Sequence, residues 1–141
     1  MDDFIFTKKS KSHVINLEKT LNQLVKARKL IIDVVSNGGQ CMMVGTKLQA
    51  SSIIQEEAVR SESFYVSQRW LGGMLTNFPT MKSRVDALKN IESTVSTADS
   101  KTNTKKELQV LSTKAKKLKK FFGGLVGIEK LPDLVFLVDT E

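Results

Sequence analysis

Apolar residues with helical spacing mark the first long element of the chain, residues 17–35. They recur every three or four positions, at Leu17, Leu21, Leu24, Val25, Ile31, Ile32 and Val35. This period predicts an amphipathic helix. Asn16 is suited to the N-cap position, and Asn37-Gly38-Gly39 is typical of a helix end.

Three short apolar runs predict strands that are buried in a sheet, at residues 41–44, 64–66 and 134–138. Gly45 follows the first run, and residues 48–60 then have a helical pattern with Ile53, Ile54 and Ala58 facing inward. A strand that leads into a helix through a glycine turn is a βα unit. We therefore expect a parallel sheet between helical layers, although three strands are few for such a sheet. A further helix would be needed to cover it.

A different pattern lies between the second and third strands. Two apolar series follow the heptad period, the first at Phe78, Met81, Val85, Leu88 and Val95, with Glu92 at its one missing position, and the second at Leu108, Leu111, Ala115, Leu118 and Phe122. They flank a polar stretch, residues 96–104, and the matched spans Met81–Val95 and Leu108–Phe122 are each about 21 Å long at the helical rise.

This symmetry predicts an antiparallel coiled-coil hairpin, residues 78–122, inserted into a body made of residues 1–77 and 123–141. The narrow apolar stripe favours a hairpin that projects from the body with its lysines outward. The alternative is a pair of surface helices that lie flat on the sheet.

The positive charge is concentrated in one segment. The net charge is +7, and residues 101–120 alone hold eight lysines against one acid, Glu107, while the rest of the chain has 14 basic and 14 acidic residues. Such a segment is typical of an element that binds a polyanion. The alternative is a solvated, lysine-rich helix face.

The sequence offers little material for catalysis or metal binding. Cys41 and His13 are the single cysteine and histidine, so neither a disulfide nor a zinc site of the usual kind can be formed. Gly45-Thr46-Lys47 lacks the upstream glycine of a phosphate loop, and Thr46 is better explained as a helix cap. Glu56 and Glu57 are adjacent and face different directions, so we expect them to be solvated. We predict no catalytic residue, no metal and no cofactor.

No apolar run reaches the length of a membrane span, and the start, Met1-Asp2-Asp3, does not resemble a signal or transit peptide. We therefore expect no membrane partner.

One central stretch resembles a family signature. Residues 68–78 (QRWLGGMLTNF) are similar to the signature of the small-subunit ribosomal protein S2 family in its bacterial and organellar form. Residues 13–20, 44–47, 64–66, 123–125 and 131–133 resemble other parts of that family along nearly the whole chain.

The resemblance implies a flavodoxin-like three-layer α/β/α body, incomplete in this chain, with an inserted coiled-coil hairpin. It also implies a structural, non-enzymatic role that binds ribosomal RNA and neighbouring small-subunit proteins. The residues expected to contact RNA are Lys101, Lys105, Lys106, Lys114, Lys116, Lys117, Lys119, Lys120, Arg69, Lys8, Lys9, Lys11 and His13. The signature residues are Arg69, Trp70, Leu71, Gly72, Gly73, Met74, Leu75, Thr76 and Asn77. For Trp70 a role as a core anchor is an equally good expectation.

The chain departs from the family pattern at both ends. Members have a further N-terminal helix, and they continue past the strand at 134–138 with more strands and helices. Three explanations stay open: a second chain that completes the sheet, a reduced protein supported by new partners, or an incomplete sequence. Lysine outnumbers arginine by 18 to 4, which suggests an AT-rich genome, and the brevity of the chain suggests an organelle. We therefore predict a mitochondrial ribosome. A plastid or the bacterial cytoplasm is the alternative location.

Two other functions remain open alternatives. One is a regulatory RNA-binding module of the same family that has left the ribosome. The other is an enzyme on a nucleotide-binding α/β fold, which would bind nucleotide at Gly45-Thr46-Lys47.

Overall fold

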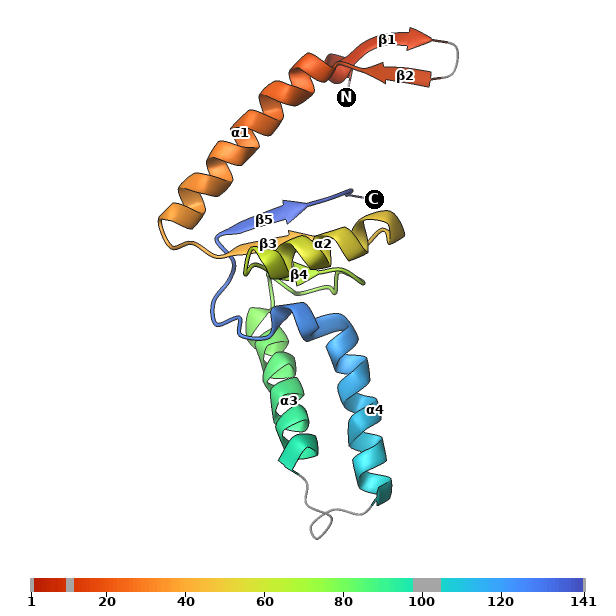
Figure 1. The fold of residues 1–141 in the computed structure, drawn as a ribbon, viewed down its shortest axis with the longest axis vertical. Helices are drawn as coiled ribbons and strands as arrows, with labels where there is room; N and C mark the ends of the chain where they lie inside the picture. The colour runs from red at the N-terminus through yellow and green to blue at the C-terminus, as the bar shows by residue number, and fades with distance from the viewer. Residues whose placement is uncertain (1, 10–11, 98–104, 141) are drawn as a thin grey trace. The chain divides into compact units, whose positions relative to one another are not determined.

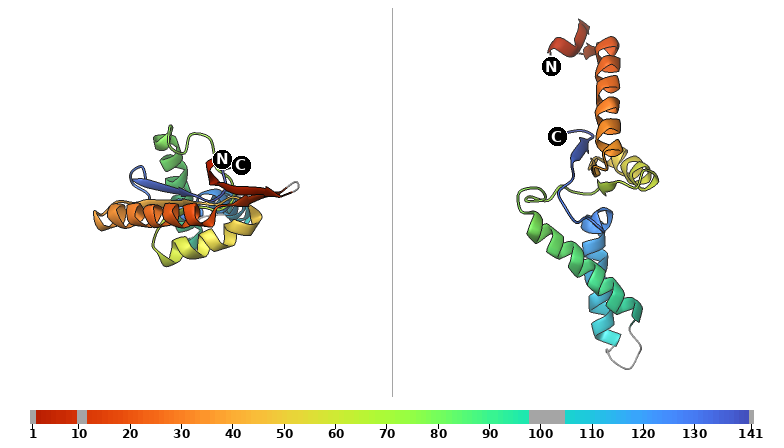
Figure 2. Two further views of the ribbon diagram at one scale, coloured as in Figure 1. Left: turned by 90° about the horizontal axis from the view of Figure 1, so that it is seen from above. Right: turned by 90° about the vertical axis from the view of Figure 1, so that its left-hand side faces the viewer.

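The structure, a computed structural model, describes residues 2–9, 12–97 and 105–140. It divides the chain into two compact units, Met1–Gly39 and Gln40–Glu141. Figures 1 and 2 show the ribbon from three directions. The predicted coiled-coil loop at 98–104 lies outside the described residues.

The first unit begins with a strand pair that the sequence analysis did not predict. A short 3-10 helix, η1 (Asp2–Phe4), leads into β1 (Ile5–Lys9), which pairs antiparallel with β2 (Ser12–Ile15). Every residue of β2 is exposed, so the pair has no alternation of buried and exposed positions. Without that alternation the apolar pattern carries no strand signal.

Helix α1 (Leu17–Ser36) confirms the first predicted helix and extends it by one residue. Asn16 caps it as expected, because its side-chain Oδ1 accepts a hydrogen bond from the Lys19 backbone N–H at 3.2 Å. At the other end Gly38 adopts a positive φ of 75°, and the Gly39 N–H donates to the Val34 carbonyl. This is the glycine-dependent helix end that Asn37-Gly38-Gly39 predicted.

The second unit is built on a three-stranded parallel sheet in the order β4-β3-β5 (Figure 1). The strands are β3 (Cys41–Val44), β4 (Phe64–Val66) and β5 (Leu134–Leu137). All three were predicted, the last one residue too long. Helix α2 (Leu48–Arg60) connects β3 to β4 and packs along both.

The inward face of α2 was predicted only in part. Ile54 and Ala58 are buried, as expected, but Ile53 is 59% exposed. Residues four apart share a helix face, whereas neighbours point about 100° apart, so Ile53 cannot share the buried stripe of the other two. Gly45 lets α2 approach, because a Cβ there would lie 2.6 Å from the Ile54 Cγ1.

Between β4 and β5 the chain forms two long helices, α3 (Phe78–Thr97) and α4 (Lys105–Phe122). They run side by side in opposite directions (Figures 1 and 2). Both predicted helices are therefore confirmed. Their coiled-coil geometry and the division of the chain at residues 78 and 122 stay predictions.

One hydrophobic core joins the sheet to the root of this helical pair. The sheet contributes Met42, Val44 and Val66, and the pair and its flanking segments contribute Met74, Met81, Val85, Leu88, Phe122, Leu125 and Ile128. Leu88 is fully buried, and Val85 and Leu125 are each 1% exposed. Farther from the sheet the pair has no buried residue among those described: Val95 is 38% and Val110 61% exposed.

A short 3-10 helix, η2 (Gly123–Leu125), turns the chain from α4 back under β4. A Cβ on Gly124 would overlap the Tyr65 carbonyl oxygen and lie 2.6 Å from two atoms of the Tyr65 ring. On Gly123 the nearest atom would be the Lys119 Cγ at 3.4 Å, an ordinary contact. The close approach of η2 to β4 therefore requires a residue without a side chain at Gly124 but not at Gly123.

We predict that Gly124→Ala destabilises the second unit by about 1–3 kcal/mol, because the added methyl overpacks the Tyr65 contact. Gly123→Ala is the matched control and should change the free energy of unfolding by less than about 1 kcal/mol. Urea denaturation of the two variants measures the difference. Equal effects at both positions would contradict the close approach of η2 to β4.

Asp133 fixes the start of β5 against the start of β3. Its Oδ2 accepts hydrogen bonds from the Gln40 backbone N–H at 2.8 Å and from the Lys130 Nζ at 3.0 Å. The Gln40 carbonyl in turn accepts from the N–H groups of Asp133 and Leu134. The Gln40 hydrogen bond, and then Lys130, lower the pKa of the Asp133 carboxyl below its usual value.

A lowered pKa in the folded state means that Asp133 stabilises the fold above its unfolded pKa of about 3.9. This contribution is lost as the pH falls through the lower, folded-state pKa. Asp133→Ala should therefore lower the midpoint of thermal unfolding at pH 7 and have a smaller effect at pH 2.5. Asp133→Asn keeps an acceptor for the Gln40 N–H, so its midpoint of thermal unfolding at pH 7 should lie between those of the wild type and Asp133→Ala. An effect of Asp133→Ala that is the same at both pH values would contradict this role.

Candidate nucleic-acid interface

Helix α4 separates apolar and cationic residues around its circumference. Leu108, Leu111, Ala115 and Leu118 are half-buried and Phe122 is buried, as the heptad pattern predicted. The described lysine side chains are exposed: Lys106, Lys114, Lys116, Lys117, Lys119 and Lys120. The positive charge that the sequence concentrates in this segment is therefore exposed to solvent along α4. Lys101 lies outside the described residues, and Lys105 begins α4 with its side chain outside them.

The lysines of α4 line two separate hollows. Lys114 and Lys117 adjoin Gln109, Val110 and Thr113 in a shallow, mostly apolar groove.

Lys116, Lys119 and Lys120 line a separate cavity of about 380 Å³ beside β4. We call it the root pocket, and its other lining residues are Gln55, Tyr65, Ser67, Gln68, Phe121, Gly123 and Gly124. The sequence analysis missed it because its wall comes from three separate segments of the chain, around Gln55, residues 65–68 and residues 116–124.

An acidic residue of α3 reaches the lysine surface. The Lys119 Nζ lies 3.0 Å from the Glu92 Oε1, and both side chains are substantially exposed. Glu92 occupies the one position where the apolar series of α3 is interrupted, so the structure gives this gap a role in joining the helices. Because the pair is exposed to solvent, it contributes little to stability.

The signature segment forms the loop between β4 and α3. Arg69 is exposed, whereas Trp70 is half-buried and packs against the hydrophobic core. Met74 is 3% exposed. Gly73 has a φ of 86°, and its carbonyl accepts a hydrogen bond from the Asn77 N–H at 2.8 Å, one turn before α3 begins. Trp70 therefore has the core-anchor position, and the left-handed turn at Gly73 requires glycine.

The N-terminal RNA-contact candidates belong to the first unit. Lys8 lies opposite His13 in the β1–β2 ladder, and both side chains are exposed. Lys9 lies opposite Ser12, with its side chain outside the described residues, as is Lys11. The ladder thus brings Lys8 and His13 together within that unit.

The turn after β3 has no feature of a nucleotide site beyond its glycine. The N-cap of α2 is Lys47 rather than Thr46, without a side-chain hydrogen bond, so the predicted Thr46 cap is wrong. Helix α2 itself begins at Leu48, as predicted, so Thr46 lies one residue before the cap position. The Lys47 Nζ lies 4.0 Å from the Asp139 Oδ2, which places a carboxylate where a phosphate group would have to approach.

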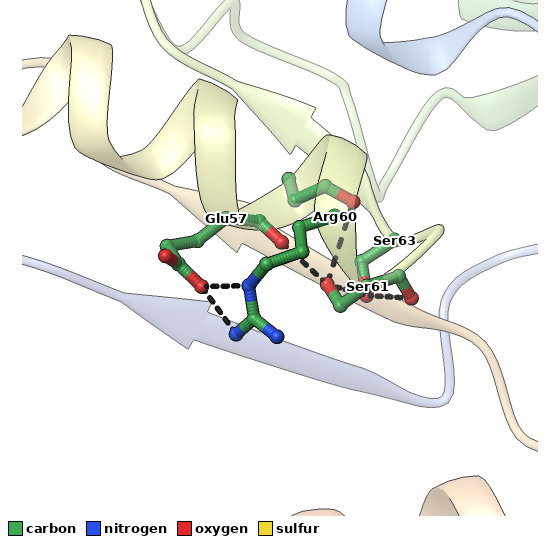
Figure 3. Close-up of polar contacts among 5 residues, drawn as sticks. Glu57, Arg60, Ser61 and Ser63 are labelled. Atoms are coloured by element: carbon green, nitrogen blue, oxygen red, sulfur yellow. Dashed lines mark hydrogen bonds and ion pairs between the residues drawn. The ribbon is translucent and has the colours of Figure 1, made fainter.

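At the C-terminal end of α2, Glu57 accepts hydrogen bonds from Arg60 and Ser61 (Figure 3). The Arg60 Nε donates to the Glu57 Oε2 at 2.8 Å, and this hydrogen bond raises the pKa of the Arg60 guanidinium. The Ser61 hydroxyl donates to the Glu57 carbonyl at 2.8 Å. Glu56 and Glu57 are both exposed, as predicted for solvated acids.

Cys41 is buried, and burial raises the pKa of its thiol. Within the described ranges no group of histidine, cysteine and acidic residues is placed to hold a metal ion. None of the helices in the described part of the chain is both long and apolar enough to cross a bilayer.

Fold and surface together define an α/β protein with a cationic helical element. Comparison with known proteins identifies the family: the chain belongs to the ribosomal protein S2 family, whose family model matches residues 1–141.

Three bacterial relatives are each named small ribosomal subunit protein uS2. The chain is 44% identical over 141 residues to the protein of Mycobacteroides abscessus and to that of Dictyoglomus thermophilum, covering all of this chain and 51% and 57% of those proteins. It is 43% identical over 139 residues to the protein of Dehalococcoides mccartyi. That match covers 99% of this chain and 57% of the relative. The chain thus spans about half the length of these relatives.

Proposed function

We propose that the chain is a structural constituent of the small ribosomal subunit that binds ribosomal RNA through the exposed lysines of α4. Family membership together with this solvated cationic helix supports the proposal. The same exposed surface disfavours the alternative of a lysine-rich helix that only keeps the protein in solution, because the excess charge is confined to residues 101–120 of an otherwise neutral chain.

The lysine side chains suit phosphate rather than base recognition. Each ends in a flexible point charge with no planar fork for a base edge, so binding follows the shape of the RNA backbone. Double-stranded RNA is contacted in this way, largely without reading sequence. The role needs no catalytic residue, metal or cofactor.

The proposal includes protein neighbours. β5 is an edge strand of the sheet, and Phe136 and Leu137 on it are 37% and 52% exposed. Another polypeptide that pairs with this edge would satisfy the free backbone groups of β5, and its side chains would pack beside Phe136 and Leu137 on the two faces of the sheet. Small-subunit proteins in general, and a second chain that completes the sheet in particular, are the protein partners we propose.

The compartment is part of the same proposal. The excess of lysine over arginine supports a mitochondrial ribosome, and the bacterial origin of the three relatives supports the alternative, a ribosome of the bacterial cytoplasm. In either compartment the particle is the small ribosomal subunit.

We predict that a tagged copy of the chain sediments with intact small subunits in a sucrose gradient and is released at high salt. The protein inventory of the purified particle then identifies both the compartment and any second chain. A chain found only in the light fractions would favour the non-ribosomal regulatory module instead.

A second prediction concerns the lysines. Changing Lys116, Lys117, Lys119 and Lys120 to Gln should weaken RNA binding and flatten its dependence on salt. Each lost phosphate contact reduces the log–log salt slope by about 0.7–0.9, so the full set reduces it by about 3. Filter binding across a range of KCl concentrations measures the slope.

The matched control changes four lysines on other helices, Lys26, Lys29, Lys82 and Lys89, to Gln. It removes the same net charge but leaves α4 intact, so the slope should stay close to that of the wild type. If the two variants flatten the slope equally, the contact surface is not on α4.

A further inference from the structure

The root pocket differs in chemistry from the rest of the lysine surface. It combines three lysines with two aromatic rings, two side-chain amides and one hydroxyl. Its volume of about 380 Å³ is within the range of small-ligand sites. A surface that only neutralises phosphates has no need of the aromatic and amide groups.

The pocket is electropositive. None of its described lining residues is acidic, and Glu92 neutralises one of the three lysines, Lys119. Lys116 and Lys120 are four residues apart on α4, so their ammonium groups lie on the same side of the helix. The two together suit one phosphate group at the pocket rim.

The wall beside β4 supplies an aromatic surface. Tyr65 and Phe121 are both half-buried, but Phe121 packs against the hydrophobic core, whereas Tyr65 lies outside that cluster. Gly124 lies so close to Tyr65 that a Cβ there would be 2.6 Å from two ring atoms, so backbone packing restricts the ring. A restricted aromatic ring is suited to stacking, since less ordering cost has to be met when a base binds.

Polar groups flank that ring. Ser67 follows β4 and is 8% exposed, and Gln68 and Gln55 extend from the loop and from α2. Amide and hydroxyl side chains both donate and accept hydrogen bonds. They match the edges of an unpaired base, which are available in single-stranded RNA and occupied in a duplex.

We propose that the root pocket binds one unpaired nucleotide of RNA, with its phosphate at Lys116 and Lys120 and its base against Tyr65. This inference rests on the proposed RNA-binding function and makes it more specific. The groove at Lys114 and Lys117 contacts the RNA backbone whether the RNA is single-stranded or double-stranded. The root pocket selects a nucleotide that is not base-paired.

The test uses the full chain with two RNA probes of equal length, a single-stranded uridine decamer and a ten-base-pair duplex. Lys116→Gln with Lys120→Gln should weaken decamer binding about tenfold or more and duplex binding less. The matched variant, Lys114→Gln with Lys117→Gln, removes the same charge from the apolar groove on the same helix. It should weaken binding of both probes by the same factor.

Stacking is tested separately. Ultraviolet cross-linking of the decamer should attach uridine to Tyr65, which is the single tyrosine of the chain, and the Lys116 and Lys120 variant should lose this product. Tyr65→Leu should weaken decamer binding about tenfold, as expected for one stacked base, whereas Tyr65→Phe keeps the ring and should retain binding. Because the lysine variants alter only exposed side chains, their result stands even if Tyr65→Leu fails to fold.

The outcomes separate the two proposals. If the wild-type chain binds neither probe, both fail. If both lysine pairs weaken the two probes equally and no cross-link forms at Tyr65, the root pocket is not a nucleotide site and the proposed function stands. Uridine monophosphate alone should compete only weakly with the decamer. Competition at the affinity of the decamer itself would make the pocket a free-nucleotide site and overturn the inference.

Discussion

The packing of the sheet on the root of the α3–α4 pair is the interaction on which the second unit depends. Val44 and Val66 of the sheet share one core with Val85, Leu88 and Phe122 of the helices. Each such side chain stabilises the fold by about 1.5–3 kcal/mol when it is removed from water. The same contacts fix where α4 begins its path away from the sheet, and therefore which of its faces can meet a partner.

The cationic surface follows from this core. Phe122 anchors the C-terminal end of α4, and the heptad residues before it face α3, so the intervening lysines are left on the outside. Lys119 and Lys120 occupy the last turn, where positive charge is favourable beside the free carbonyls of the helix end. Anchoring at this end also places Lys116 and Lys120 next to β4, where η2 turns closely around Tyr65.

Periodicity predicted the elements that bury an apolar face. Helices α2, α3 and α4 and the three parallel strands follow from it, because burial imposes a repeat of 3.6 or a continuous apolar run. Helix α1 has the same apolar spacing, but none of its residues is buried in the structure. The β1–β2 pair has no buried face and was not predicted. Ile53 and Thr46 were misassigned for a related reason: apolar spacing does not fix the role of a single residue, so it cannot tell which of two adjacent residues faces inward or caps the helix.

Sites formed by residues distant in sequence are harder to predict than elements. The lysines of α4 are visible in the sequence because seven of them lie within its 18 residues. The root pocket is not, because Gln55, Tyr65 and Lys120 become neighbours only after the sheet, α4 and η2 have packed. Its chemistry also depends on Gly124, whose role is to leave space and which carries no recognisable binding group.

The groove at Lys114 and Lys117 and the root pocket would contribute to RNA affinity in physically different ways. Contacts from lysine to phosphate release counterions, so they weaken steeply with salt. Stacking on an aromatic ring is less sensitive to ionic strength, because it arises from dispersion and burial rather than net charge. A helix with both kinds of contact would retain a preference for unpaired nucleotides at salt concentrations where its electrostatic binding to the RNA backbone is largely lost. Charge would then govern how fast the RNA is captured, and the pocket which part of it is held.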